Sequence, residues 1–337
     1  MGNLLLRLPT PIVVWGSFFV AGIFVYLAAA FARPASIERK ALVKCFVAGD
    51  WSHKSAVTDL IAYVIGKITG LLQAGLMPII TLSIAGVFTG GIHYFFPAEH
   101  FFHANILIFL CCALILIFFS DFSGWLSHVA QHYVPVLWEL HKVHHSALFL
   151  NPLTARRGHT FGILFDDVAH ACIMGPPTGL LIVIFNLNPV EITLLGAFAN
   201  KFFFMITLEA LQHSHYPINF GFFDRIFISP HMHQIHHSSR PEHWDKNFGY
   251  IFSLWDWLFK TAYRPKRGEV IVYGIGEGET AAYQGFYGVY VLPMIGMWRV
   301  ITRKTPNATG RPKHDRRYSP AGILWRDPAA APMGAIE

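Results

Sequence analysis

The stretch at residues 104–145 reads ANILIFLCCALILIFFSDFSGWLSHVAQHYVPVLWELHKVHH and joins two features that decide the fold. Its first part, Ala104 to about Phe119, is apolar enough to cross a bilayer as a helix, because a hydrocarbon core about 30 Å thick needs about 20 apolar residues. Its second part carries five histidines at helical spacing. The sequence therefore predicts a chain that leaves a membrane and at once builds a histidine-rich site.

The composition of the whole chain also indicates a membrane protein. Of the 337 residues, 53% are hydrophobic and 14% are charged, whereas a soluble domain carries about 25% charged residues. Soluble proteins need charge to cover their surface, so this deficit predicts a surface that faces lipid. The cysteines show neither a disulfide framework nor zinc spacing, and we expect them to pack as small apolar residues. They are Cys45, Cys111, Cys112 and Cys172.

Four further apolar stretches predict membrane helices, at Pro11–Phe31, Leu60–Phe88, Phe161–Phe185 and Val190–Leu211. The Leu60–Phe88 stretch is interrupted by glycines and by Pro78, so it is either one long kinked span or a span plus a re-entrant piece. We expect an all-α, multi-pass membrane helical bundle of four or five spanning segments, with a cytoplasmic helical cap that carries the histidine clusters.

The distribution of Lys and Arg predicts the orientation. Arg33, Arg39, Lys40 and Lys44 follow the first span, and a lone Arg7 precedes it. Cytoplasmic loops carry the excess of Lys and Arg, so the N-terminus is expected outside the cytoplasm. Three spans then place the segment after Phe119 in the cytoplasm, and a transmembrane hairpin at about 161–211 returns the chain to that side.

The net charge of +6 arises largely beyond Phe259. We interpret it as cytoplasmic residues near anionic lipid headgroups rather than as a nucleic-acid site. Without a linker or repeat, the chain is treated as one domain. N-terminal transmembrane segments occupy residues 1–120, the histidine-rich catalytic region residues 121–264, and a basic C-terminal tail residues 265–337.

The histidines carry the chemical signal. Of the 19 histidines, 13 lie between His128 and His237, and the pattern His-x-x-His-His occurs twice, at 141–145 and 233–237. Residues three or four apart share a helix face, so His128 and His132 can reach one ion, as can His141 with His144 or His145. Neighbouring residues point about 100° apart and can serve different ions. About eight convergent imidazoles exceed the needs of one four-coordinate ion, so two ions are the economical explanation.

Ligand type alone does not name the metal, because imidazole suits zinc, copper, iron and nickel. The sequence lacks His-Glu-x-x-His, a P-loop and Gly-x-Gly-x-x-Gly, so no flavin, haem or nucleotide site is expected. The membrane context favours iron. Two alternatives stay open: a zinc-dependent membrane hydrolase and a metal-binding transporter.

From Asp121 to about Arg264 the chain resembles the fatty acid hydroxylase/sterol desaturase superfamily of membrane di-iron enzymes. The residues that carry the resemblance are His128-Val-Ala-Gln-His132, Leu137 to Ser146, Asn151, Thr154-Ala155-Arg156, Gln212-His213, Pro230 to His237, Asn247-Phe248-Gly249 and Trp255-Asp256-x-Leu258-Phe259. Leu258 to Thr261 and Tyr273-Gly274-Ile275 look most like alkylglycerol monooxygenases and related bacterial proteins.

The resemblance implies a set of iron ligands: His128, His132, His141, His144, His145, His213, His233, His236 and His237. Further residues are candidates for the metal or for contacts to its ligands: His159, His215, His231, Glu209, Asp121 and Asn247. Carboxylates such as Asp121, Glu139, Glu209 and Asp224 could accept the outer N–H of the ligand imidazoles.

The resemblance also implies the activity. Two iron ions would use O₂ and external electrons to hydroxylate or desaturate a C–H bond of a lipid or sterol-like substrate. No cofactor motif for electron supply is present, so a separate reductase or electron carrier is implied. The sequence leaves open which lipid is attacked.

We predict that the N-terminus faces away from the cytoplasm and that the histidine clusters and the C-terminal tail face it. A single cysteine at Asn307, in a cysteine-free background, should react with an impermeant maleimide only from the cytoplasmic side. Reaction at Asn307 from the outer side alone would reverse the proposed topology.

Overall fold

The computed structural model describes residues 53–95, 105–206, 209–214, 217–266, 269, 271–276 and 279–302. The predicted span Pro11–Phe31 and residues 303–337 of the tail lie outside the described residues. Within these ranges the chain is mostly helical, and extended pairing is limited to the isolated bridges Phe227–Phe252 and Ser238–Tyr273. The predicted all-α class is therefore confirmed.

The long elements are α3 (Lys54–Phe95), α4 (Ile106–Tyr133), α5 (Pro135–His145), α6 (Thr160–Phe185), α7 (Pro189–Ile206) and α12 (Leu292–Ile301). The short helices are α8 (Glu209–Gln212), α9 (Pro230–His236), α10 (Leu254–Leu258) and α11 (Glu279–Ala282). Short turns of 3₁₀ or π helix are η1 (Thr154–Arg156), η2 (Gly221–Arg225), η3 (Pro241–His243) and η4 (Tyr287–Val291).

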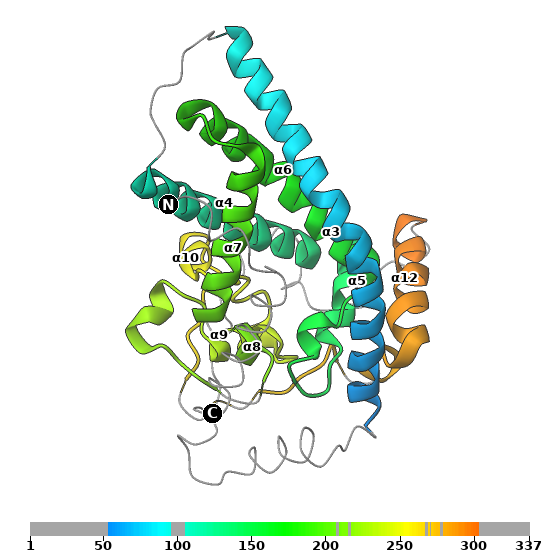
Figure 1. Ribbon diagram of the computed structural model, residues 1–337. Coiled ribbons are helices and arrows are strands. Elements are labelled where there is room, and N and C mark those ends of the chain that lie inside the picture. The colour runs from blue at the N-terminus through cyan, green and yellow to red at the C-terminus, as the bar shows by residue number, and fades with distance from the viewer. Residues whose placement is uncertain are drawn as a thin grey trace, which may run out of the picture.

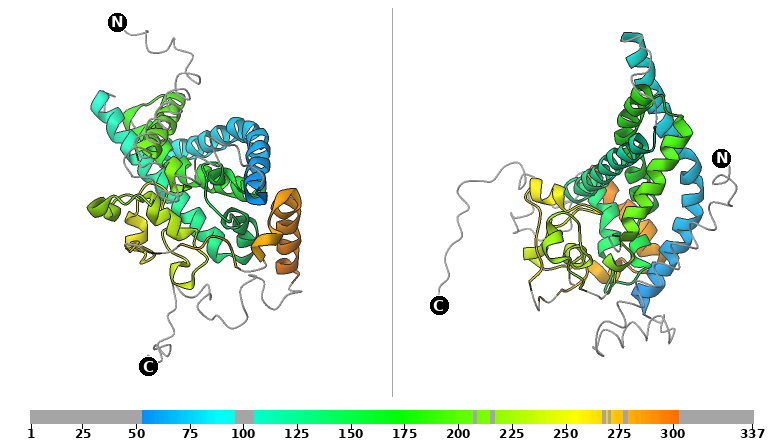
Figure 2. Two further views of the ribbon diagram at one scale, coloured as in Figure 1. Left: turned by 90° about the horizontal axis from the view of Figure 1, so that it is seen from below. Right: turned by 60° about the vertical axis from the view of Figure 1, so that its left-hand side comes forward.

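Three helical segments in the described ranges are long and apolar enough to cross a membrane: Gly75–Phe95, Leu107–Tyr133 and Thr160–Phe185. They expose large apolar side chains, among them Val87 and Leu107, as expected for helices surrounded by lipid. The short elements after residue 209, together with α5, form a histidine lobe at the opposite end of the molecule from the C-terminal end of α3 (Figures 1 and 2).

The α3 helix is continuous over 42 residues and passes through Pro78. At 1.5 Å per residue it is about 63 Å long, roughly twice the thickness of a bilayer core. The segment Gly75–Phe95 can therefore span the membrane while the N-terminal half extends to the histidine lobe. This favours the long-helix alternative over a re-entrant piece.

The α4 helix extends further than its hydropathy predicted. The apolar run ends at about Phe119, but the helix continues to Tyr133 and carries His128 and His132 on its last turns. Pro135 then occupies the first turn of α5, where a missing N–H costs nothing, and it forces an extended conformation on Val134. The sharp corner at Val134 turns α5 back toward the end of α4.

The α6 helix packs tightly on α3 through two glycines one helical turn apart, Gly175 and Gly179. A Cβ atom added at Gly179 would lie 2.6 Å from the carbonyl oxygen of Ala85, and one added at Gly175 would collide with the side chain of Ile84. Small residues at this spacing let membrane helices approach closely, because lipid itself provides no hydrophobic force between them.

We expect Gly179→Leu to destabilise the protein by about 1–3 kcal/mol, the usual cost of overpacking a tight contact. Gly86→Leu on α3 is the matched control, since a Cβ there meets no atom within 4 Å. The measurement is reversible unfolding in detergent. Equal stability of the two variants would contradict the close α3–α6 contact.

Candidate metal centre

The structure brings the nine histidines of the predicted ligand set into two adjacent groups. Five of them offer nitrogens that all lie within 4.8 Å of one another, and the other four do the same. The first group contains His128, His132, His141, His145 and His236, and the second contains His144, His213, His233 and His237. Eight of the nine side chains are buried, and His144 is partly buried.

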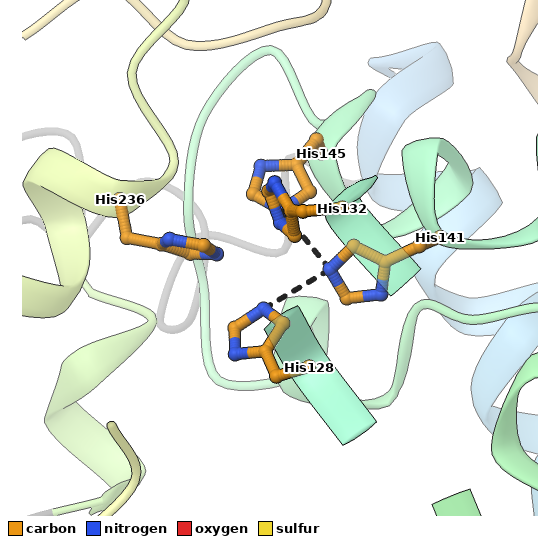
Figure 3. Close-up of side chains that lie close together, drawn as sticks. All are labelled: His128, His132, His141, His145 and His236. Carbon is orange, nitrogen blue, oxygen red and sulfur yellow. Dashed lines mark hydrogen bonds between the residues drawn. The ribbon is translucent and has the colours of Figure 1, made fainter. Parts of the chain in front are cut away.

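The first group forms where three helices meet (Figure 3). The end of α4 supplies two imidazoles, α5 supplies two, and α9 supplies His236. The Nε2 atom of His141 lies 3.1 Å from that of His128 and 3.2 Å from that of His145. The Nε2 atoms of His132 and His145 are 3.1 Å apart.

The second group forms around His213, which directly follows α8. The Nε2 atom of His213 lies 3.1 Å from those of His233 and His237, and 3.3 Å from that of His144. His233 and His237 are themselves 3.2 Å apart at Nε2. The Gln234 side chain donates to the Ser214 carbonyl at 2.7 Å, which holds α9 beside the segment of His213.

The two His-x-x-His-His motifs divide their side chains between the groups in opposite ways. In the first motif, His141 and His145 enter the first group and His144 enters the second. In the second motif, His233 and His237 enter the second group and His236 enters the first. Residues four apart share a face and the intervening one points elsewhere, so each motif links both groups.

At His128 and His141 the nitrogen positions fit a shared metal ion and do not fit a hydrogen bond between the two imidazoles. His128 Nδ1 donates to the Phe248 carbonyl at 2.9 Å, and His141 Nδ1 donates to Gln131 Oε1 at 3.1 Å. A neutral imidazole has one N–H, so both Nε2 atoms then present lone pairs to each other at 3.1 Å. Nitrogens bound about 2.0–2.1 Å from one transition-metal ion lie about 3 Å apart. A cation between them removes the repulsion.

A similar arrangement holds at two other histidines. His144 Nδ1 donates to the Arg157 carbonyl at 3.0 Å, and His236 Nδ1 donates to the Lys246 carbonyl at 2.7 Å. The buried Nε2 of His236 has no hydrogen-bond partner among the described residues. An outer N–H held by an acceptor fixes the tautomer and aims the other nitrogen, as in known metal sites.

Burial keeps the imidazoles in the neutral form that binds metal. It lowers the pKa of His144 to about 4, despite its bond to the Arg157 carbonyl. Burial, reinforced by neighbouring imidazoles, also lowers the pKa values of His141, His145, His213, His233, His236 and His237 well below 6.5. Near neutral pH these groups could therefore accept a metal ion without first losing a proton.

The other predicted site residues with described side chains lie outside both groups. His159 accepts the Phe161 N–H at 3.1 Å and caps α6. His231 is buried on α9 but does not enter either group. Asn247 fixes α9 by donating to the Met232 carbonyl at 2.9 Å. His215 and the side chain of Glu209 are outside the described residues.

The outer N–H groups meet different acceptors from the carboxylates that the sequence suggested. Asp121 accepts from the backbone N–H groups of Ile251 and Phe252 at 2.7 and 3.1 Å. Glu139 pairs with Lys142 at 2.7 Å, and Asp224 accepts from the Phe220 N–H at 3.0 Å. These three side chains shape the surroundings of the site. Backbone carbonyls and Gln131 orient four of the imidazoles, those of His128, His141, His144 and His236. The Nδ1 atoms of His213, His233 and His237 have no hydrogen-bond partner among the described residues.

Gln131 and Asp245 are contacts that the sequence did not single out. Gln131 Nε2 donates to Asp166 Oδ1 at 2.6 Å, so its own orientation is fixed by α6. Asp245 Oδ1 lies 3.5 Å from His132 Nδ1. Gln131 directly precedes His132 in the sequence, and this neighbourhood is the one sequence feature that could have indicated its role.

Arg157 is the most extensively bonded residue near the site whose role the sequence did not predict. Its side chain is fully buried and pairs with Asp59 of α3 at 3.1 Å. It also donates to the carbonyls of Val143, Ser146 and Tyr283 at 3.1–3.2 Å. The Arg157 carbonyl accepts from His144, so this arginine ties one metal-facing imidazole to α3, α5 and the C-terminal part of the described chain.

Comparison with known proteins matches the family model described as fatty acid hydroxylase over residues 113–261. Alkylglycerol monooxygenase of Caenorhabditis elegans is 26% identical over 204 residues, which is 59% of this chain and 36% of that protein. Ornithine lipid hydroxylase of Rhizobium tropici is 26% identical over 152 residues, 44% of this chain and 40% of that protein.

Alkylglycerol monooxygenase of Danio rerio is 28% identical over 155 residues, 46% of this chain and 31% of that protein. The matches therefore span less than half of each relative's own length. No solved structure matches the chain significantly. The resemblance to the fatty acid hydroxylase superfamily, and to alkylglycerol monooxygenases and bacterial relatives within it, is confirmed by these matches.

We expect His236→Ala and His237→Ala each to lower the metal content by about half, because each removes a ligand from only one group. Metal per purified chain, measured by inductively coupled plasma mass spectrometry, is the readout. His93→Gln, at an exposed position on α3, is the control. Unchanged metal content in both variants would contradict the ligand assignment.

Proposed function

We propose that this chain is a membrane di-iron oxidoreductase that uses O₂ and external electrons to hydroxylate a C–H bond of a lipid. The observation that carries the proposal is the convergence of nine imidazoles, eight of them buried, at the end of a helix apolar enough to cross a membrane. Two irons bound there would supply the O₂ chemistry that an unreactive C–H bond requires.

The protein's own residues would hold the ligands and exclude water. The first group is closed off by Phe248, a fully buried side chain whose ring lies 4.9 Å from that of His132 and 5.5 Å from that of His236. Trp138 covers His132 from the α5 side at 5.1 Å between ring centroids. A dry pocket strengthens electrostatic contacts and limits side reactions of oxygen with water.

The names of the relatives guide the proposed substrate class. One is a monooxygenase of alkylglycerols and another a hydroxylase of ornithine lipids. Both names denote lipid substrates. We propose a lipid substrate that is taken from the membrane crossed by α3, α4 and α6. Hydroxylation is the proposed outcome. Desaturation is the variant, because it begins with the same abstraction of a hydrogen atom.

The two alternatives fit the site less well. A zinc hydrolase typically uses three protein ligands and a carboxylate base, whereas nine imidazoles converge here. A metal transporter needs polar groups along several spans. Here the two groups gather at the end of α4 and in the histidine lobe.

Turnover should require O₂ and a separate electron donor, and should stop on iron chelation. The reason is that cleaving an unactivated C–H bond needs an oxidant stronger than any side chain. Purified protein in lipid nanodiscs would be supplied with an alkylglycerol lipid, a reductase system and air, and products would be followed by mass spectrometry as a gain of one oxygen or a loss of two hydrogens.

The control is the same mixture under argon or without reductant, in which the lipid should remain unchanged. Conversion of the lipid under argon would overturn the oxidative proposal and favour the hydrolase. Tightly bound zinc in place of iron, with full activity, would do the same.

A further inference from the structure

The outer side of the histidine lobe carries a dense group of exposed apolar side chains, which we call the apolar rim. Its two most exposed members are Phe222 of η2, at 68%, and Leu258 of α10, at 64%. The remaining members are Phe223, Ile226, Leu254, Trp257 and Phe259. Contiguous exposed apolar surface of this kind marks a site that contacts a partner or a membrane.

The rim is a fixed surface built from two segments. Ser253 Oγ and Trp257 Nε1 both donate to the Asp224 carbonyl, at 2.8 and 3.3 Å. The backbone N–H of Ser253 donates to the Ile226 carbonyl at 2.9 Å. These bonds lock α10 to η2, so the apolar side chains of both segments are held in place together.

The rim is continuous with the membrane-spanning helix α4. Trp255, on the inner side of α10, packs on Phe118 and Phe122 with ring centroids 4.6 and 4.8 Å apart. Phe259 stacks on Trp125 at 4.6 Å. Phe118 is itself exposed, and Figure 1 shows α10 beside α4. The lipid-facing surface of α4 therefore continues directly onto the rim.

Basic side chains accompany the apolar ones. Arg225, Lys260 and Arg264 are all exposed. The guanidinium of Arg225 lies 5.7 Å from the ring centroid of Phe222, and Arg264 Nη2 donates to the Gly221 carbonyl at 3.2 Å. The nearby Asp224 and Asp256 are buried. Aromatic rings with Arg and Lys are the residues that settle at the headgroup level of a bilayer.

We propose that the apolar rim is a second membrane contact, lying in the plane of the bilayer at headgroup depth, and that its partner is the phospholipid surface of the membrane that α4 crosses. Anionic lipids are favoured by the three flanking cations. The contact does not depend on the chemistry of the metal centre.

A short series of hydrogen bonds connects the rim to the first histidine group. Asp256 of α10 accepts the backbone N–H groups of Phe248 and Gly249, both at 2.9 Å. The Phe248 carbonyl in turn accepts from His128 Nδ1 at 2.9 Å. The proposed membrane contact thus fixes the height of the metal centre above the bilayer.

The test uses full-length protein in vesicles, with an environment-sensitive fluorophore on a single cysteine in a cysteine-free background. The label replaces Phe222 or Leu258 in separate variants. Glu242, exposed on η3, serves as the water-facing control, and Val87, in the Gly75–Phe95 span, as the deep control. Lipids spin-labelled near the headgroup end or near the methyl end of the acyl chain are the quenchers, and iodide reports access from water.

We expect both rim labels to be quenched most by the spin label near the headgroup end, and several-fold less by iodide than the Glu242 label is. Adding phosphatidylglycerol to phosphatidylcholine vesicles should strengthen this lipid quenching, and Arg225→Gln with Lys260→Asn should remove that increase. Arg240→Gln, at a partly exposed position where the arginine pairs with Glu242, is the matched charge control and should leave it intact.

Three results would overturn the proposal. Strong iodide quenching without lipid quenching would mean that the rim faces water. Protection from both quenchers would mean that protein, such as a second copy of this chain, covers it. A depth equal to that of Val87 would place the rim in the hydrocarbon core. Because the labelled side chains are exposed, their replacement should not prevent folding, and metal content checks this.

Discussion

The lone pairs of two neutral imidazoles, His128 and His141, face each other at Nε2 across 3.1 Å, and this is the constraint on which the rest of the site depends. Burial disfavours the imidazolium form, and the outer nitrogens of His128, His141, His144 and His236 already donate elsewhere. Such an arrangement is repulsive unless a cation lies within it. The fold must therefore hold these imidazoles tightly by itself, and a cation bound between them would stabilise the fold.

The surrounding polar network provides that rigidity. Asp121 and Asp256, both buried, collect four backbone N–H groups between Phe248 and Phe252 and hold this loop against α4. The buried ion pair of Arg157 with Asp59 likewise holds α3 against α5. Buried ion pairs add little net stability when compared with apolar packing, but breaking one leaves an uncompensated charge. Their role here is to fix positions, because each network includes a carbonyl that accepts from a metal-facing imidazole.

Much of this could be predicted from sequence, and the limits have physical reasons. Helical periodicity placed His128 with His132 and indicated that one motif could serve two ions, but it left His144 and His145 interchangeable. The corner at Val134, which sends His145 rather than His144 to the first group, resolved this. Hydropathy ended the α4 span at Phe119, because Asp121, Ser123 and Ser127 are polar, although tertiary contacts continue the helix to Tyr133. The acceptors of the outer N–H groups are mostly backbone carbonyls, which no residue type in the sequence can indicate. The ion pair of Asp59 with Arg157 could not be predicted either, because the two residues are 98 positions apart in sequence.

Anomalous X-ray diffraction from crystals of the iron-loaded protein, recorded above and below the iron edge, tests the central claim most directly. The account predicts two anomalous peaks, one among the Nε2 atoms of His128, His132, His141, His145 and His236, and one among those of His144, His213, His233 and His237. A single peak shared by both groups, or iron bound elsewhere with both groups empty, would contradict it.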